Sequence, residues 1–209
     1  AATTPVYKPI PQVDEEKCTY CGKCSEICAY NALAVLAEHV LVFAELCHGC
    51  GGCTRLCPED AITEVGQEIG VVERGHAGKV EFVHGKLNVG EAMSGPVIKA
   101  VKKHINGQPF VLLDAPPGTS CPVVITLLGS DFCILVTEPT PFGLHDLKIT
   151  IEVLENIAIP FGVIVNRAGL GDQRVYEYCK EKKIPILLEI PYQRKIAKLY
   201  SMGVPFTSE

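Results

Sequence analysis

The chain has 209 residues, of which 47% are apolar and 21% charged, so a packed globular core is expected. Its net charge of −5 argues against a nucleic-acid-binding surface, which needs clustered Lys and Arg. No apolar run reaches the roughly 18 residues of a membrane-spanning helix, and the first residues lack a signal-peptide pattern. We therefore expect a cytoplasmic protein with no membrane span and no nucleic-acid partner.

Residues 1–13 are rich in proline and predict an extended lead-in. The chain has 11 cysteines, and most of them lie in two segments, CTYCGKCSEIC from Cys18 and CHGCGGCTRLC from Cys47. The second segment repeats the first at a constant offset, the one that relates Cys18 to Cys47. The repeat predicts a duplicated α+β domain over residues 14–70 that is too small to fold on hydrophobic burial alone.

Both segments have the spacing C-x2-C-x2-C-x3-C, which is typical of bacterial two-cluster ferredoxins. In this pattern the first three cysteines hold one [4Fe–4S] cluster and the fourth reaches the other cluster. The predicted ligands of one cluster are Cys18, Cys21, Cys24 and Cys57, and those of the other are Cys47, Cys50, Cys53 and Cys28. Pro58 follows the second copy as usual, whereas Ala29 replaces that proline in the first.

Zinc sites and disulfides account less well for these cysteines. Zinc needs four ligands and has no use for the third and fourth cysteine of each copy. A secreted disulfide scaffold fits poorly, because the rest of the chain looks like an ordinary α/β core. Clustered cysteines on such a chain indicate metal binding in a reducing compartment.

Residues 71–209 predict strands that alternate with helices. The predicted strands are VEFVHG, FVLLD (110–114), FCILVTE (132–138), FGVIVN (161–166) and ILLEIP (186–191). Helical spacing follows in EAMSGPVIKAVKKHI, LHDLKITIEVLENI, DQRVYEYCKEKK and RKIAKLYSMG. Continuous apolar strands that alternate with helices predict a parallel sheet covered on both faces.

Polar residues or proline stand where four of these strands end: Asp114, Glu138, Asn166 and Pro191. In open parallel sheets, ligands bind at the carboxyl ends of the strands. The sequence therefore predicts a binding crevice there. An aspartate in this position can also cap the next helix, and an asparagine is common in turns.

The segments LLDAPPGTSCPVV, VTEPTPFGLHDLK and VIVNRAGLGD together resemble the MinD/Mrp-type P-loop ATPases, most closely the branch with an inserted ferredoxin domain. The resemblance covers nearly all of the chain. It implies an α/β fold: a parallel-sheet, P-loop NTPase-like core (71–209) with an inserted ferredoxin-like domain.

The resemblance also implies roles for individual residues. Asp114 matches the aspartate that holds Mg²⁺ through water, and Gly118 and Thr119 match the segment that senses the γ-phosphate. Asn166 matches the residue that hydrogen-bonds adenine, and the segment after Pro191 matches the other side of the base pocket. ATP or ADP with Mg²⁺ would be the cofactors, and a homodimer is the implied assembly.

The phosphate loop of that family has no counterpart here, since G-x4-G-K-[ST] matches nowhere in the chain. Lys79 and Lys86 follow glycine but precede an apolar residue, not Ser or Thr. We expect that the missing loop and strand lie upstream in a longer protein, or on another polypeptide. We also expect that this chain alone does not hydrolyse ATP.

Three functions remain open at this point. The first is an ATPase that couples nucleotide state to electron transfer or iron–sulfur cluster handling. The second is a plain electron carrier, and the third is a scaffold that passes clusters to an apo-protein. The partner would be a redox protein or an apo iron–sulfur acceptor. Cys121 could ligate metal or aid cluster transfer, or it could be an ordinary small buried residue.

Overall fold

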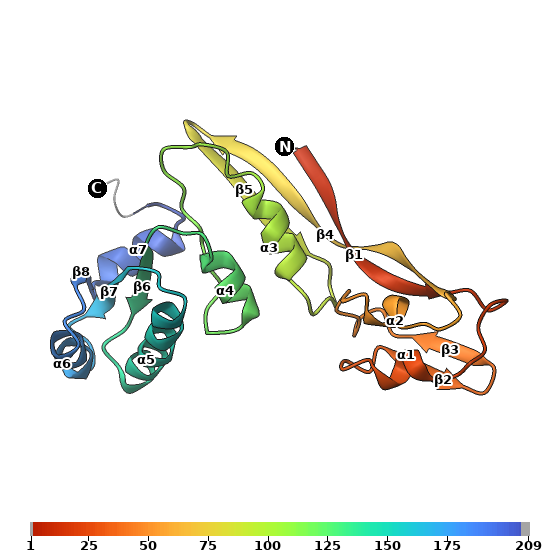
Figure 1. Cartoon of the computed structure of the whole chain (residues 1–209). Helices are drawn as coiled ribbons and strands as arrows, with labels where there is room; N and C mark the ends of the chain where they lie inside the picture. Colours follow the sequence, from red (N-terminus) through yellow and green to blue (C-terminus); the bar gives the residue numbers. More distant parts are fainter. Residues whose placement is uncertain (1, 206–209) are drawn as a thin grey trace. The chain divides into compact units, whose positions relative to one another are not determined.

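The computed structural model describes residues 2–205, and the chain divides into two compact units. Unit 1 ends at Leu112 and unit 2 begins at Leu113, whereas the sequence suggested a division at residues 70 and 71. Figure 1 shows the elements of both units along the chain. Among residues 2–205, no helix has both the length and the apolar character to cross a membrane.

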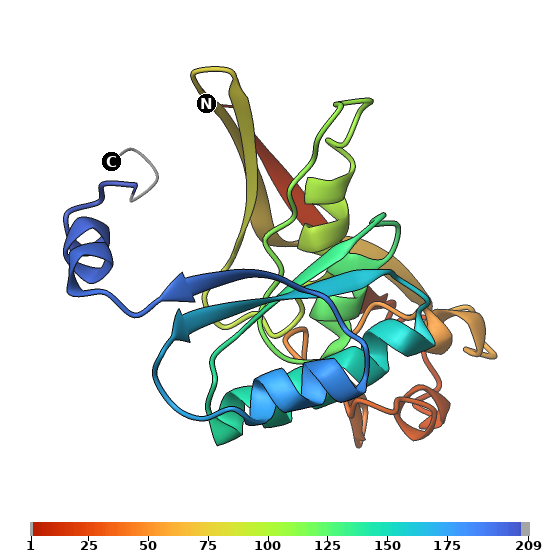
Figure 2. The ribbon, with the colours of Figure 1, turned by 90° about the vertical axis from the view of Figure 1, so that its left-hand side faces the viewer.

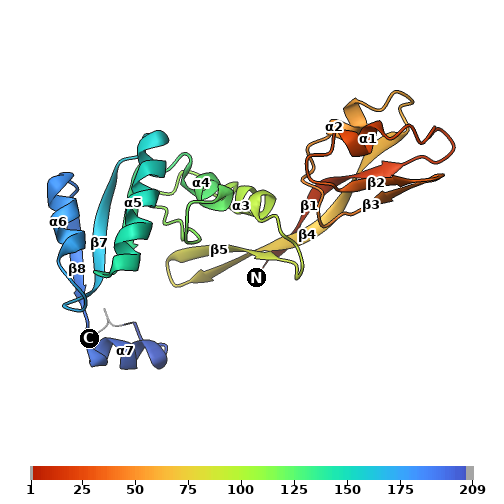
Figure 3. The same cartoon turned by 90° about the horizontal axis from the view of Figure 1, so that it is seen from below.

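Unit 1 contains two antiparallel sheets and three short helices. Its elements are β1 Ala2–Val13, α1 Lys23–Glu26, β2 Leu33–Leu36, β3 His39–Val42, α2 Gly52–Arg55, β4 Ile62–Ala77, β5 Val80–Leu87 and α3 Gly95–Lys102. The strands pair in the order β1-β4-β5 in one sheet and β2-β3 in the other. The helices α1 and α2, one from each cysteine repeat, lie side by side (Figure 3).

The duplication extends to strand pairing. In the β2–β3 hairpin Leu33 pairs with Val42, and at the equivalent positions of the other repeat Ile62 of β4 pairs with Val13 of β1. The backbone bond from Phe43 N–H to the Ala32 oxygen likewise has its counterpart between Asp14 and Ala61. The end of the predicted lead-in is therefore the strand that completes the second half of the duplicated domain.

The helix α3 covers the larger sheet of unit 1. Its Val97 is buried with Val6, Ile69 and Val72, and Gly85 of β5 lies so close to Val97 that any added Cβ would overlap it. Beside this cluster Lys8 Nζ donates to a Glu91 carboxylate oxygen at 2.8 Å, and the two side chains are only 2% and 7% exposed. A buried ion pair therefore fixes the loop that leads into α3.

Unit 2 is a three-stranded parallel sheet with helices. Its elements are α4 Cys121–Leu127, β6 Cys133–Thr137, α5 Pro141–Asn156, β7 Phe161–Ala168, α6 Arg174–Glu181, β8 Ile186–Pro191 and α7 Arg194–Ser201. The strand order is β6-β7-β8, and both pairings are parallel, as the alternation of strands and helices predicted. Figure 2 shows α5 and α6 on the same side of this sheet.

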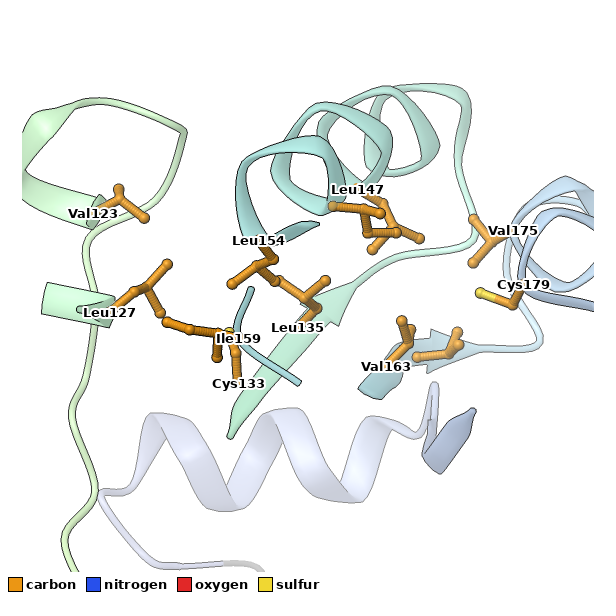
Figure 4. Packing of buried hydrophobic residues seen from close by; sticks show 12 residues of the cluster. Val123, Leu127, Cys133, Leu135, Leu147, Leu154, Ile159, Val163, Val175 and Cys179 are labelled. Carbon is orange, nitrogen blue, oxygen red and sulfur yellow. The ribbon is translucent and has the colours of Figure 1, made fainter. Parts of the chain in front are cut away.

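The core of unit 2 forms on that side (Figure 4). Alternate residues of β6, such as Leu135, are buried against Leu154 of α5 and Val163 of β7. On the opposite face Ile134 and Val136 are 51% and 63% exposed. The expectation of a sheet covered on both faces is therefore wrong for the residues that the structure describes.

The prediction of a strand at FVLLD is also wrong. Residues 110–116 have no regular structure, and Phe110 and Leu112 are 91% and 93% exposed. An apolar, β-prone run becomes a strand only when a neighbouring strand pairs with its backbone groups. In the described part of the chain, β6 pairs with β7 alone, so FVLLD joins no sheet.

The ion pair of Lys8 and Glu91 gives a stability prediction. Glu91→Ala leaves a buried ammonium without its carboxylate, so the free energy of unfolding should fall by about 3–5 kcal/mol. The double variant Lys8→Met/Glu91→Leu removes both charges and should restore most of that loss. Chemical denaturation measures both. A Glu91→Ala protein as stable as the wild type would contradict the structural role of the pair.

Candidate iron–sulfur centres

A cavity in unit 1, cavity 1, lies among the cysteines of both repeats. Three cysteines of the first repeat line it together with the last cysteine of the second: Cys18, Cys21, Cys24 and Cys57. Apolar side chains such as Val13, Val35 and Ile62 complete the wall. Four thiols in an apolar wall are the donor set that a [4Fe–4S] cluster requires.

A second cavity, cavity 2, has the reciprocal composition. Three cysteines of the second repeat line it together with the last cysteine of the first: Cys47, Cys50, Cys53 and Cys28. Its remaining wall includes Pro9 and Pro11 of β1 and the rings of Tyr30 and His48. The fold thus brings the eight predicted cysteines together in the two crossed groups of four.

The backbone of the two repeats explains this arrangement. Each single-turn helix begins after a left-handed glycine, Gly22 with φ 80° before α1 and Gly51 with φ 71° before α2. Residues with a side chain rarely adopt this conformation, so the glycines allow the sharp turn after the second cysteine of each repeat. The helical turn then places the fourth cysteine in the other cavity.

Backbone N–H groups donate to cysteine sulfurs of both repeats. The Ala32 N–H lies 3.3 Å from Cys28 Sγ, and the Ala61 N–H lies 3.3 Å from Cys57 Sγ at the equivalent place in the other repeat. The Gly49 N–H donates to Cys47 Sγ at 3.4 Å. Such bonds stabilise negative charge on a thiolate and help to set the reduction potential of a bound cluster.

Burial of the cysteines follows the duplication at the second and third cysteine of each repeat, but not at the first. Cys21 and Cys50 are exposed and Cys24 and Cys53 are partly buried, whereas Cys47 is buried and Cys18 only partly so. Burial raises the pKa of the Cys24 and Cys53 thiols, because a thiolate loses its hydration there. Iron binding at these two positions would therefore displace a proton.

All eleven cysteines are free thiols in this structure. Among residues 2–205, no group of three His, Cys, Asp or Glu side chains is drawn together closely enough to hold one metal ion. A cubane differs from a single ion because each of its four thiolates binds a separate iron atom.

Sequence reasoning missed the contribution of β1 to cavity 2. Gly49 lies so close to Pro9 that an added Cβ would stand 3.0 Å from the Pro9 oxygen. The signal was present in the offset of the repeat, which relates residues 10–13 to the strand at 39–42. The stacked pair of Tyr30 and His48 carried no such signal, because its partners come from different repeats.

The residues proposed for nucleotide binding lie in unit 2. Asp114 and Gly118 are exposed on the irregular segment before α4, and Thr119 on the same segment is partly buried. Asn166 lies near the end of β7, and Pro191 ends β8 and pairs with Ala168. Two of these positions therefore share the carboxyl edge of the sheet, while Asp114 follows no strand.

The carboxyl edge has its own local contacts. The Asn166 side-chain oxygen accepts from the N–H of Arg167, a residue with φ 53°, so Asn166 supports a tight turn. The Arg167 guanidinium lies 3.3 Å from Glu138, which follows β6. These contacts join the ends of β6 and β7.

The three cysteines outside the cavities differ in burial. Cys133 and Cys179 are 8% and 1% exposed within the core of unit 2, which confirms the interpretation that they are core residues. Burial raises the pKa of both thiols. Cys121 is exposed at the start of α4, so it is not the buried residue that one interpretation suggested.

Comparison with known proteins agrees with the cavity geometry. Residues 11–34 and 40–63 each match the family described as 4Fe-4S binding domain. The chain therefore contains two 4Fe–4S binding repeats. The matched ranges begin before Cys18 and include the end of β1, as the strand pairing does.

Two longer relatives come from Methanocaldococcus jannaschii, and both are uncharacterized proteins. One is 34% identical over 127 residues, which is 60% of this chain and 44% of that protein. The other is 31% identical over 188 residues, which is 89% of this chain and 66% of that protein. The chain thus spans less than two thirds of either relative.

The carboxyl edge of unit 2 gives a second prediction. Gly171 has φ 81°, and an added Cβ would overlap the Pro139 oxygen, whereas Gly169 has φ 93° and open space around it. Gly169→Ala should lower the free energy of unfolding by about 1–2 kcal/mol through backbone strain alone. Gly171→Ala should lower it further, because the loops after β6 and β7 must separate. Equal losses in denaturation experiments would contradict this.

Proposed function

We propose that this chain is an electron-transfer protein that carries two [4Fe–4S] clusters, one in each cavity. The observation that carries the proposal is the lining of the cavities by three cysteines of one repeat and the fourth cysteine of the other. The proposed ligands are Cys18, Cys21, Cys24 and Cys57 in cavity 1, and Cys47, Cys50, Cys53 and Cys28 in cavity 2. The 4Fe-4S family match supports the same assignment.

Electron transfer follows from the ligand sets. Four thiolates give every iron of a cubane a protein ligand, so no iron keeps an open position for a substrate. The clusters would accept and donate single electrons, and the protein supplies the sulfur ligands, the N–H donors and the apolar walls. Cys24 lies in α1, Cys28 follows two residues after its end, and they line different cavities, so one helical turn joins the proposed ligands of the two clusters.

For unit 2 we propose adenine-nucleotide binding coupled to the clusters. The support is the resemblance to MinD/Mrp-type ATPases together with polar groups at the carboxyl edge of a parallel sheet, where ligands bind in such folds. Asp114 would hold Mg²⁺, Gly118 and Thr119 would face the γ-phosphate, and Asn166 and the segment after Pro191 would hold the base. Coupling would direct electrons or clusters to a redox or apo iron–sulfur partner, in a homodimer.

The crossed ligand sets can be tested with paired substitutions. The wild type purified without oxygen should contain about eight iron atoms, and Cys57→Ala about half of them. Adding Cys21→Ala to Cys57→Ala should cost no further cluster, because both residues serve cavity 1. Adding Cys50→Ala instead should remove the second cluster too. Iron, sulfide and the electron paramagnetic resonance of the reduced protein measure this.

The same experiment has a clear contrary outcome. If each repeat held its own cluster, Cys57→Ala/Cys50→Ala would keep one cluster and Cys57→Ala/Cys21→Ala would lose both. Cys121→Ser is the control, since Cys121 lines neither cavity and should leave the iron content unchanged. A wild-type protein without iron would refute the proposed function itself.

Nucleotide binding is tested separately with a fluorescent ATP analogue. Asn166→Ala should weaken binding of ATP and ADP alike, because it removes a contact to the base. Asp114→Asn should remove the dependence of binding on Mg²⁺ and leave the metal-free affinity unchanged. Equilibrium titration with and without Mg²⁺ separates the two effects. Absence of binding at millimolar nucleotide would refute the role of unit 2 and leave the iron–sulfur proposal standing.

A further inference from the structure

The rings of Tyr30 and His48 form a parallel stack at the wall of cavity 2. Their centroids lie 3.5 Å apart, and their planes differ by 5°. Tyr30 is 44% exposed and lies in the turn after Cys28, and His48 directly follows Cys47. Both rings line the cavity, so the stack joins the end of the first repeat to the cysteine loop of the second.

The stack lies close in sequence to Cys28, the cysteine of the first repeat that lines cavity 2. Cys47, Cys50 and Cys53 belong to one continuous loop, which keeps them together. Cys28 comes from the first repeat, so its position near them depends on packing between the repeats, such as that of α1 against α2. Tyr30 lies two residues after Cys28, and His48 is next to Cys47, so the contact between their rings opposes separation of Cys28 from the loop.

Among the described residues that line cavity 1, no pair of rings makes an equivalent connection. The offset of the repeat places Thr19 where the second copy has His48, and Glu59 where the first has Tyr30. Neither side chain is aromatic. Cavity 1 does have one ring, Tyr20, but it belongs to the same loop as Cys18 and Cys21 and does not join the repeats. Thr19 and Glu59 are therefore the positions of cavity 1 that correspond to the stacked pair of cavity 2.

We propose that the Tyr30–His48 stack is a clasp that retains the cluster of cavity 2, so that the two clusters are lost at different rates. The proposal rests on the proposed function, since it presupposes a cluster in each cavity. The rings act by positioning Cys28 against the loop, and they are not ligands themselves. Cavity 1 loses its cluster first.

The test measures iron release from the whole chain, without oxygen, in dithionite with a ferrous chelator. Dithionite supplies the electrons that reduce the ferric irons. Each cluster then gives its four irons to the chelator as Fe²⁺, while its four sulfides and four cysteine thiolates take up protons from water and become hydrogen sulfide and free thiols. The wild type should release iron in two phases of equal size. In Tyr30→Ala the slow phase should become about two- to tenfold faster, as expected for loss of one aromatic pair.

The conservative variant and the matched positions complete the design. Tyr30→Phe keeps the stacked ring and should keep the slow phase, and His48→Ala should accelerate it as Tyr30→Ala does. Glu59→Ala and Thr19→Ala, at the equivalent positions of cavity 1, should leave the slow phase unchanged. Circular dichroism of each variant before chelation checks that the fold is retained.

The outcomes separate the clasp from the proposed function. Two clusters that are released at one rate in the wild type, or a slow phase that Tyr30→Ala and His48→Ala leave unchanged, would overturn the clasp. An equal acceleration in Tyr30→Phe would also overturn it, because the ring remains. These results leave the clusters in place, whereas a protein without two clusters at the start would refute the proposed function.

Discussion

The exchange of the fourth cysteine between the two repeats is the constraint on which unit 1 depends. The buried apolar side chains between residues 14 and 65 are few and mostly small: Ala32, Leu33, Cys47, Ala61 and Ile62. Burial of this size cannot offset the conformational entropy of the segment. Iron–sulfur bonds that require both repeats at once would join the halves, and cluster binding would then be part of folding.

The long strands of unit 1 extend this constraint beyond the cysteines. The end of β1 completes the duplicated domain, and the preceding residues continue along β4 to the sheet that α3 covers. Two adjacent residues of β1 contribute to these two parts of unit 1. Pro9 contributes to the wall of cavity 2, and Lys8 forms the buried ion pair with Glu91 before α3. One strand thus serves the cluster site and the second core.

The sequence predicted those structural features that depend on residues close together in the chain. Cysteine spacing predicted which thiols share a cavity, because one helical turn after a left-handed glycine leaves little choice of direction. Continuous apolar runs predicted β6, β7 and β8, but the same criterion failed at FVLLD. Whether FVLLD forms a strand depends on the presence of a second strand that pairs with it, and the local sequence does not show this. The stacking of Tyr30 on His48 could not be predicted from the sequence either, since it depends on how the two repeats pack.

The two proposed functions differ in how much of their machinery the described residues contain. All eight thiols of the proposed cluster sites lie in unit 1, where backbone N–H groups donate to sulfurs of both repeats. In unit 2 the carboxyl edge offers Asn166 and the end of β8, but the chain has no glycine-rich phosphate loop. In P-loop folds, the backbone N–H groups of that loop hold the phosphates, so this chain by itself would lack those contacts. The proposed iron–sulfur function therefore needs no nucleotide, whereas the proposed coupling would.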